Sequence, residues 1–446
     1  MELTPVRGCR DFLPEKKITR DAITEKLRRV FEEYGFNPLE TPALENYELL
    51  SSKYAGGEEI LKETYRLTDQ GRRELGLRYD LTVPLCRVIA ANPRMPMPFK
   101  RYQIASVWRD GPIKAGRYRE FVQCDVDTIG AKGMIADSEL IALTQDAFDA
   151  LGMKAFVKIN NRKLLDALLG KAGIPSAKQP DAILALDKLA KIGRDGVRSE
   201  MFERGVEAKS AEEILVMFDS FGKKGNDEII DKLAAIVGSE DPAGRIPQDA
   251  SYKGEGLKEL RDVMQYCAAF GVREDFVRID PSLGRGLSYY TGTVFEAYLL
   301  DASKITSSIA AGGRYDKLVG AFAGRGEDIP AVGISFGLDV IGEALADGAK
   351  EKKTVVRAFV IPIKTGAAAA KAAQELRRMG VPTAIDLNER GVSRCLEYAA
   401  KEGIPFCVLV GEAELKQKSV KLRDMATGKE ELLSVAEAAD RIKSNL

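Results

Sequence analysis

The sequence predicts a multidomain α/β protein in which an α+β domain with an antiparallel sheet carries a helical insertion and is followed by a small α/β domain. First, the chain of 446 residues is longer than one ordinary domain. Second, strand-like sequence on both sides of a long helical stretch indicates one interrupted domain. Third, strands and helices alternate regularly near the C-terminus, which is typical of a small α/β domain with a largely parallel sheet.

The first part of the chain predicts helices and strands in close succession. Residues 15–35 carry an amphipathic stripe that includes Leu27, Val30 and Phe31, and Gly35 is a plausible C-cap. Residues 36–44 are expected to be extended at an edge, because they contain two prolines. Strands or strand–helix units are expected over 76–90, 99–110 and 119–130, and a helix over 135–151.

The remaining pattern sets the expected domain boundaries. From about 165 to 265 the chain has helical spacing of Leu and Ala, and strand-like sequence returns at 276–300 and again up to Ile341. The charged stretch LADGAKEKKT at 345–354 resembles a linker. The boundaries we expect are, in order, 1–165 and 266–345 for the interrupted domain, 166–265 for the helical insertion and 354–446 for the C-terminal domain.

The composition excludes several kinds of chemistry. The chain contains no histidine, which excludes imidazole metal ligands and Ser-His or Cys-His catalysis. Its six cysteines are scattered without a CxxC pair, which suits reduced thiols and argues against structural zinc. Lys plus Arg (67) equals Asp plus Glu (67), so any RNA contact must come from a local basic patch. No apolar run reaches membrane-spanning length and no signal peptide is evident, so a cytoplasmic protein with no membrane partner is expected.

Two glycine-containing segments are not phosphate-binding loops. GGRYDKLVGAFAG lacks the GxxxxGK[ST] pattern, and Lys364-Thr365-Gly366 resembles it only superficially. A bound nucleotide would therefore need another kind of site.

Four blocks combine polar residues with strand-like sequence: LRYDLTVPLCR (77–87), VWRDGPIKAGRYREFVQCDVDTIG (107–130), LGRGLSYYTGTVFEAY (283–298) and SIAAGGRYDKLVG (308–320). The first block is expected to place Asp80 and Thr82 at the end of a short polar strand. In the second, alternation brings Gln123, Asp125 and Asp127 to one strand face, which is too polar for a core. Each block alone is also compatible with a solvated hairpin.

Together these blocks resemble the class II histidyl-tRNA synthetases over nearly the whole chain. RGCRDFLP, followed by the expected helix and Pro42, resembles motif 1, the dimer-forming element, and the block at 107–130 resembles motif 2. The blocks at 283–298 and 308–320 resemble the two histidine-specific signature peptides, and PAVGISFGLDVI (330–341) resembles motif 3. LRYDLTVP and GRYREFVQCD match the archaeal and eukaryotic branch better than the bacterial one. The C-terminal domain resembles the anticodon-binding domain of the family.

The resemblance implies a homodimeric ligase that activates histidine with ATP and Mg²⁺ and loads it onto tRNA(His). By this resemblance Arg109 and Arg285 are catalytic and contact the ATP phosphates, where negative charge develops during adenylate formation. The resemblance also implies that the α-amino end of histidine is bound by Asp80, Thr82 and Gln123. Its ring is expected to be surrounded by Asp127, Tyr290 and Tyr315. ATP is expected to be bound also by Arg117 and Arg119. Tyr289 and Tyr290 are expected to point to opposite strand faces, so that one lies in the site and the other in the core.

The sequence departs from the family pattern at three positions. Val340 stands where motif 3 usually has an arginine that packs on ATP, Gly111 replaces an acidic residue of motif 2, and Ser288 replaces the aspartate of RGLDYYTG. A valine cannot contact phosphates, so another cation must neutralise them. The candidates are Arg117, Arg119 and Arg314.

Two alternative functions stay open. One is the non-catalytic, histidine-binding paralogue that regulates ATP phosphoribosyltransferase, which the missing motif 3 arginine favours but the signature peptides and the C-terminal domain oppose. The other is an RNA-binding module, which does not explain Arg109, Arg285 and the polar strand face.

Overall fold

The computed structural model describes residues 3–52, 61–113, 116–222, 224–238, 252–286, 289–301, 305–324, 327–346 and 352–444. The chain divides into two compact units, Met1–Arg10 with Ile23–Asp347 and Asp11–Ala22 with Gly348–Leu446. Ser288 and half of the expected linker at 345–354 lie outside the described residues. No helix in the described parts of the chain combines the length and apolar character needed to span a bilayer.

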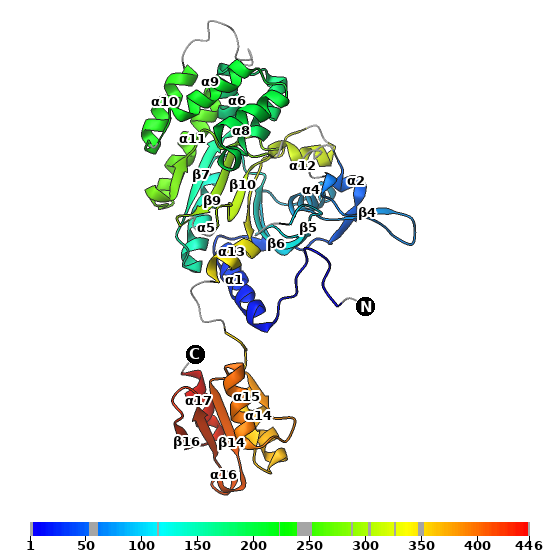
Figure 1. Ribbon diagram of the computed structural model, residues 1–446, viewed down its shortest axis with the longest axis vertical. Coiled ribbons are helices and arrows are strands. Elements are labelled where there is room, and N and C mark those ends of the chain that lie inside the picture. The colour runs from blue at the N-terminus through cyan, green and yellow to red at the C-terminus, as the bar shows by residue number, and fades with distance from the viewer. Residues whose placement is uncertain are drawn as a thin grey trace. The chain divides into compact units, whose positions relative to one another are not determined.

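The first unit is built on an eight-stranded sheet with the order β1-β5-β6-β11-β10-β9-β7-β8 (Figure 1). The inner strands from β5 to β7 pair antiparallel, whereas the edge strands β1 and β8 pair parallel with β5 and β7. Its strands are β1 (Asn37–Pro38), β5 (Phe99–Trp108), β6 (Glu120–Ile129), β7 (Ala155–Asn161), β8 (Val277–Ile279), β9 (Thr293–Leu299), β10 (Ala310–Arg314) and β11 (Ala331–Gly337). The mixed fold and its mainly antiparallel sheet confirm the predicted fold class.

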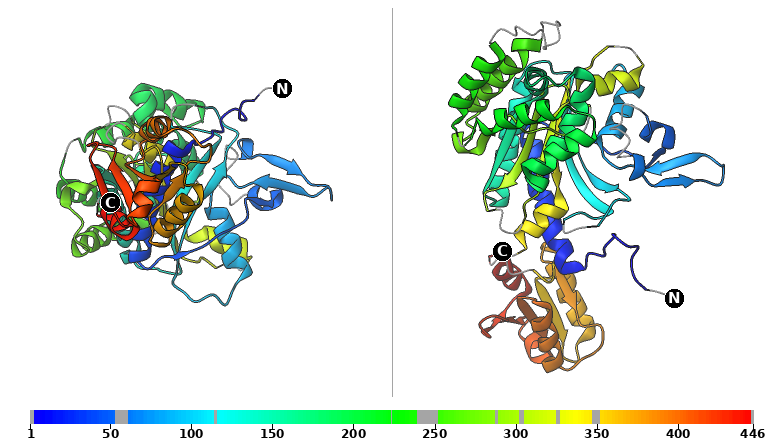
Figure 2. Two further views of the ribbon diagram at one scale, coloured as in Figure 1. Left: turned by 90° about the horizontal axis from the view of Figure 1, so that it is seen from below. Right: turned by 45° about the horizontal axis from the view of Figure 1, so that its top comes forward.

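One face of this sheet is polar and carries fewer helices. The helices α4 (Thr82–Ala91) and α12 (Asp316–Ala323) pack together near Ile129 and Ala331, at one end of this face. A three-stranded antiparallel sheet adjoins it, with β2 (Leu44–Asn46), β3 (Arg66–Thr68), β4 (Glu74–Leu77) and the short helix α2 (Tyr47–Leu50). This small sheet projects in blue on the right of both views in Figure 2.

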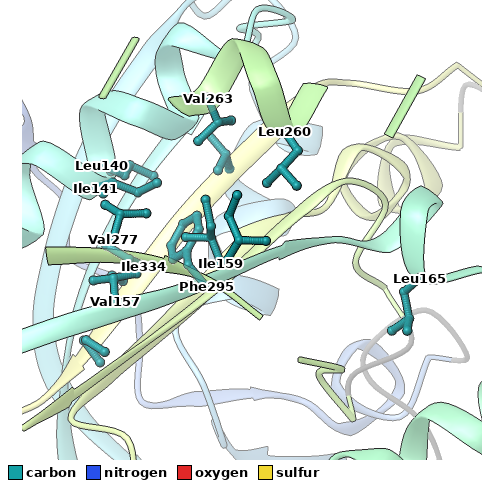
Figure 3. Close-up of a cluster of buried hydrophobic side chains, with 14 of the residues drawn as sticks. Leu140, Ile141, Val157, Ile159, Leu165, Leu260, Val263, Val277, Phe295 and Ile334 are labelled. Carbon is teal, nitrogen blue, oxygen red and sulfur yellow. The ribbon is translucent and has the colours of Figure 1, made fainter. Parts of the chain in front are cut away.

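The opposite face of the large sheet holds the main hydrophobic core. Val157, Ile159, Phe295 and Ile334 of the strands pack against Leu140 and Ile141 and against other helical side chains (Figure 3). The covering helices are α1 (Pro14–Glu33), α5 (Ile135–Leu151), α6 (Arg162–Lys171), α11 (Tyr252–Ala269) and α13 (Leu338–Leu345). As predicted, α1 buries Leu27, Val30 and Phe31, and Gly35 follows its end with a φ of +76°.

The described residues between α6 and β8 form helices only. They are η1 (Ser176–Lys178), α7 (Gln179–Leu186), α8 (Leu189–Glu203), α9 (Ala208–Asp219), α10 (Asn226–Gly238) and η2 (Glu274–Phe276), together with α6 and α11. Their apolar stripes, for example Ile214 and Leu215 of α9, join the same core as the sheet. A left-handed Gly193 interrupts α8.

The C-terminal unit contains a five-stranded sheet with the order β13-β12-β14-β15-β16. Its elements are β12 (Ala358–Pro362), α14 (Gly366–Arg378), β13 (Thr383–Ile385), α15 (Val392–Glu402), β14 (Phe406–Val410), α16 (Glu412–Lys416), β15 (Val420–Asp424), β16 (Glu430–Leu433) and α17 (Val435–Lys443). The helices α14 and α17 contribute to one core and α15 to another.

Only half of the strand pairs in this second sheet are parallel. β12 pairs parallel with β13 and β14, but β14, β15 and β16 pair antiparallel. The sequence pattern does not predict the hairpin of β15 and β16, because both strands carry many charged residues. Asp424 closes the turn by accepting hydrogen bonds from the backbone N–H groups of Ala426 and Thr427, and Gly428 supplies a φ of +74°.

Candidate active site

The polar face of the large sheet aligns residues from strands that are far apart in the sequence. In one row Arg101 of β5, Asp127 of β6, Gly333 of β11 and Gly313 of β10 are register partners. Partners in register point to the same face of a sheet. In the next row the partners are Gln103, Asp125, Ser335, Ala311 and Glu296. The face is therefore polar at its sides and floored by small residues in the middle.

Gly333 and Gly313, the glycines in the middle of this face, have neighbouring groups so close that no Cβ atom would fit. A Cβ atom on Gly333 would lie 1.9 Å from Oδ1 of Asp127. A Cβ atom on Gly313 would lie 2.6 Å from the carbonyl oxygen of Thr293 and 2.9 Å from the ring of Tyr290. The glycines let an acidic and an aromatic side chain lie directly on the backbone of the central strands.

Asp127 is the centre of a buried ionic group. Its side chain pairs with Nη2 of Arg101 at 2.7 Å, and Tyr315 donates its hydroxyl hydrogen to the other carboxylate oxygen. Asp127 is 3% exposed and Arg101 fully buried. Burial raises the pKa of Asp127, and the Arg101 charge opposes that shift. The structure thus brings together two of the residues predicted to surround the histidine ring.

Asp80 and Thr82 do not lie on a strand, which corrects the sequence-based prediction. Asp80 follows β4 in a loop, and Thr82 is the first residue of α4. Asp80 accepts a hydrogen bond from the backbone N–H of Val83 at 3.0 Å, so its carboxylate satisfies a free donor at the start of the helix. Burial raises the pKa of Asp80 to about 6, and the Arg109 charge opposes this shift.

Gln123 and Asp125 lie on the same face of β6 as Asp127, as the alternation predicts. Oε1 of Gln123 and Oδ1 of Asp125 are buried and have no hydrogen-bond partner among the described residues. Burial raises the pKa of Asp125 to about 7. Buried acceptors without a donor are rare in native proteins and are typical of a site awaiting a ligand or water.

Arg109 lies at the end of β5 and is held from two sides. Its Nε donates to the carbonyl oxygen of Tyr79 at 3.0 Å, and its guanidinium carbon lies 5.0 Å from the centre of the Phe121 ring. Burial lowers the pKa of Arg109, and the charge of Asp80 counteracts this. An arginine remains protonated under such conditions, so a positive charge is fixed beside the Asp80 carboxylate.

Arg285 is held by a carboxylate that the sequence analysis did not identify. Arg285 forms an ion pair with Glu296 of β9, and the hydroxyl of Tyr298 also donates to Glu296. The side chains of Arg285 and Glu296 are 19% and 10% exposed. Glu296 occurs within the apolar run TVFEAYL, and a single acid in such a run is the signal that could have revealed it.

Tyr289 and Tyr290 are adjacent but do not point to opposite faces, contrary to the prediction. Neither lies in a strand, and their ring centroids are only 4.8 Å apart. The Tyr289 ring also meets Tyr315 edge-on at 6.1 Å, while the guanidinium carbon of Arg285 lies 5.9 Å from the centre of the Tyr290 ring. The aromatic side chains therefore form one continuous group between Arg285 and Asp127.

The remaining candidate arginines have different surroundings. Arg117 is exposed and pairs with Glu63 at 2.6 Å, and Arg119 pairs with Asp110 at 3.0 Å. Arg314 is 2% exposed and binds Asp137 of α5 on the apolar side of the sheet. The proposal that Arg314 replaces the motif 3 arginine is therefore wrong, because its side chain points away from the polar face.

Val340 packs at the start of α13 beside the loop that contains Gly116. A Cβ atom on Gly116 would lie 3.8 Å from Cγ2 of Val340. Next to Val340, Asp339 pairs with Arg10 at 2.5 Å and accepts a hydrogen bond from the backbone N–H of Val122. The segments that resemble motifs 1, 2 and 3 thus meet at Asp339.

A large mixed sheet with this polar face, two arginines and a cluster of carboxylates defines the catalytic domain of a class II aminoacyl-tRNA synthetase, an ATP-dependent ligase. The model of the histidyl-tRNA synthetase family matches residues 8–341, and that of the anticodon binding domain matches residues 357–445. The chain belongs to the histidyl-tRNA synthetase family.

Relatives of known name agree over almost the whole chain. Histidine--tRNA ligase 1 of Bacillus cereus (strain ZK / E33L) is 44% identical and covers 96% of this chain and 97% of its own length. Histidine--tRNA ligase of Aeropyrum pernix is 39% identical, and the alignment covers 98% of this chain and 97% of that protein. The crystal structure of histidyl-tRNA synthetase from Nostoc sp. PCC 7120 aligns over all of both chains, with a TM-score of 0.84 and 30% identity.

A second solved structure shares the fold alone. It is an ATP phosphoribosyltransferase regulatory subunit/histidyl-tRNA synthetase from Bacillus halodurans C, with a TM-score of 0.72 and 22% identity, covering 90% of this chain and 97% of that one. The same fold therefore does not by itself distinguish a ligase from a regulatory subunit. The high identity to the ligases and the anticodon-binding domain favour the ligase.

Proposed function

We propose that this chain works as a cytoplasmic homodimer that converts histidine and MgATP into histidyl-adenylate and pyrophosphate, and then transfers the histidyl group to tRNA(His). In the first step a carboxylate oxygen of histidine attacks the α-phosphorus, and the bond to the bridging oxygen of pyrophosphate breaks. The Mg²⁺ arrives with the ATP phosphates as part of the substrate.

The pocket for histidine is proposed to extend along β6 and the start of α4. Asp80, Thr82 and Gln123 would receive the α-ammonium group, because they offer a carboxylate and neutral oxygens as acceptors. Asp127, Tyr290 and Tyr315 would surround the ring. The contact between Asp127 and Tyr315 supports this, because it fixes the orientation of an acceptor carboxylate before the ligand arrives.

Arg109 and Arg285 are proposed to stabilise the charge that develops on the α-phosphoryl group. Each guanidinium group is held by a protein acceptor, Arg109 by the Tyr79 carbonyl and Arg285 by Glu296. Arginines that are oriented before the reaction stabilise developing charge without reorganisation at the moment of reaction. Arg117 and Arg119 are proposed to contact the outer phosphates, after exchange of their present partners Glu63 and Asp110 for ATP.

The further assignments rest on the resemblance of particular segments. Motif 1, which begins near Arg10, is proposed to form the dimer interface. The C-terminal unit is proposed to bind the anticodon of tRNA(His), which the match to the anticodon-binding family supports.

The observation that carries the proposal is the set of carboxylates on β6 and before α4 beside the arginine at the end of β5. The proposed function is tested by measuring histidine-dependent exchange of labelled pyrophosphate into ATP with the purified full-length protein. We expect exchange that requires histidine and is not supported by other amino acids. Histidine binding without exchange would favour the regulatory paralogue, and the absence of both would contradict the pocket.

A further inference from the structure

The polar face of β6 carries two buried acceptors that have neither a hydrogen-bond donor nor an ion-pair partner among the described residues. They are Oε1 of Gln123 and Oδ1 of Asp125, both without a hydrogen-bond partner among the described residues. Asp125 is only 3% exposed. An ionised carboxylate with an unpaired oxygen in such a position is costly unless a donor occupies the space above it.

Asp125 differs in this respect from its neighbour Asp127. One oxygen of Asp127 accepts from Tyr315 and the other contacts Arg101. Oδ2 of Asp127 lacks a hydrogen bond among the described residues but is neutralised by the ion pair with Arg101, whereas Oδ1 of Asp125 has neither a hydrogen-bond donor nor an ion-pair partner there. Of the two aspartates, Asp125 is the one with an acceptor left for a ligand.

The position of Asp125 along the strand also points to the ligand. Residues two apart on a strand point to the same face and lie about 7 Å apart along it. A ligand that reaches both Gln123 and Asp127 must pass over Asp125, which lies between them in the register. The small partners on β11, Gly333 and Ser335, leave this part of the face without a large side chain.

The charges around Asp125 suit a cationic ligand. The groups that face it from the neighbouring elements are Arg101 and Gln103 of β5, Ser335 of β11, Gln123 and Asp127 of β6, Asp80 before α4, and Arg78. Among these the guanidinium of Arg101 most strongly opposes the raised pKa of Asp125, and its Nη2 is already paired with Asp127. An incoming ammonium or imidazole N–H would supply both the missing donor and additional positive charge.

We propose that Asp125 is a third substrate-facing carboxylate, a specificity-determining residue that accepts a hydrogen bond from an N–H group of bound histidine. This proposal rests on the histidine-binding function proposed above. It adds to the pocket a residue that the family motifs did not assign to the ligand.

The test compares wild type with Asp125→Asn in histidine-dependent pyrophosphate exchange. The variant keeps the size of the side chain and removes its charge. We expect the KM for histidine to rise about ten- to a hundredfold, the range for a lost hydrogen bond to a charged group, while the KM for ATP changes by less than about threefold. The matched control is Asp280→Asn, which removes the partner of Lys158 at the far edge of the same sheet and should leave both KM values unchanged.

The pH dependence separates a ligand contact from a merely structural role. Burial raises the pKa of Asp125 to about 7, so the group is neutral well below that pH and charged above it. The ratio of the KM for histidine in Asp125→Asn to that in wild type should therefore be small near pH 6 and grow toward pH 8.5. Titration of the substrate occurs in both proteins and largely cancels in the ratio.

The outcomes are distinct. If Asp125→Asn does not fold, Asp125→Ser removes the same charge with a smaller side chain and takes its place. A histidine KM within about twofold of wild type, or a raised ratio that is independent of pH, would overturn the role of Asp125. If wild type itself shows no histidine-dependent exchange, the proposed function fails, and that result is visible before any variant is made.

Discussion

At the scale of single residues, the catalytic candidates are held by partners rather than left free in solvent. Arg285 pairs with Glu296, which also accepts a hydrogen bond from Tyr298. Arg101 and Asp127 form a second pair beneath the pocket. Removing one member of a buried pair leaves the other without compensation, so a loss of activity must be separated from a loss of stability.

Arg285→Ala should reduce the rate of pyrophosphate exchange about 10²–10³-fold, because a positive charge aimed at the developing phosphoryl charge is lost. It should also lower the thermal midpoint, since among the described residues Glu296 then keeps only the Tyr298 hydroxyl as a donor. The matched control is Arg285→Ala with Glu296→Gln, in which the midpoint should recover but the exchange should not. Exchange at the wild-type rate in Arg285→Ala would contradict the catalytic assignment.

The raised pKa of Asp80 predicts how the free energy of unfolding depends on pH. Folding raises the pKa of its carboxyl group to about 6, above the value of about 3.9 in an unfolded chain. The native state therefore loses this proton at a higher pH than the unfolded chain does. Because ionisation of the buried carboxyl group is unfavourable, the free energy of unfolding falls as the pH rises from about 4 through 6.

Asp80→Asn stays neutral, and its amide oxygen can still accept the hydrogen bond from the backbone N–H of Val83. The variant should match wild type near pH 4 and be more stable at pH 7.5, by up to about 3 kcal/mol for a shift of about two pKa units. Its KM for histidine should rise, because the ammonium loses an acceptor charge. Calorimetric unfolding at both pH values checks the first point, and a wild type that is more stable than the variant at pH 7.5 would refute it.

At the scale of elements, α13 carries the clearest departure from the family. Val340 packs with the main core and beside Gly116, and its neighbour Asp339 holds Arg10. Val340→Arg should improve the KM for ATP by no more than a few-fold, because Arg117 and Arg119 are proposed to serve the phosphates. The long side chain must also displace the Gly116 loop, so thermal stability should fall.

The KM for ATP in histidine-dependent exchange measures this effect. An improvement of about tenfold, or about 1.4 kcal/mol, would mean that the protein lacks a phosphate contact that its other arginines do not supply. The regulatory alternative would then gain support.

The elements also show what a sequence can predict. The two long strands β5 and β6 and the shared face of Gln123, Asp125 and Asp127 follow from alternation, because a period of two leaves no other face for these side chains. The pairing of Arg285 with Glu296 joins two segments through tertiary packing, which alternation does not encode. The sequence predicts a strand at Thr82 because its β-branched residues obscure the start of α4, where Asp80 accepts a hydrogen bond from Val83.

The two other errors have related causes. The rule that neighbours point to opposite faces holds only in a strand, and Tyr289 and Tyr290 lie in a loop. The sequence predicts an ATP contact for Arg314 because this residue lies in a signature peptide. Its place at the end of β10 turns it instead toward Asp137, where a buried acid needs a counter-charge.

At the scale of the whole molecule, the two units have separate cores. The carboxylates and arginines of the pocket all belong to the first unit, and the second contains the region that matches the anticodon-binding family. Activation of histidine and recognition of tRNA are therefore expected to be separable.

A chain that ends near Lys352 should still be a dimer and make histidyl-adenylate at a rate close to that of the full chain. Its charging of tRNA(His) should be poor, because the proposed anticodon contacts are missing. Pyrophosphate exchange is the internal control for folding of the shortened protein. Unchanged aminoacylation by this protein would refute an anticodon role for residues 355–446.

The glycine floor under the pocket limits how the protein can be redesigned. Because Asp127 and Tyr290 rest directly on the backbone at Gly333 and Gly313, a side chain at either glycine position would displace them. A library aimed at new amino acids should therefore leave these two positions unchanged. Variation has room around them, on β6, at the start of α4 and in the loop of Tyr289, where a larger or smaller side chain changes the proposed pocket and leaves its base intact.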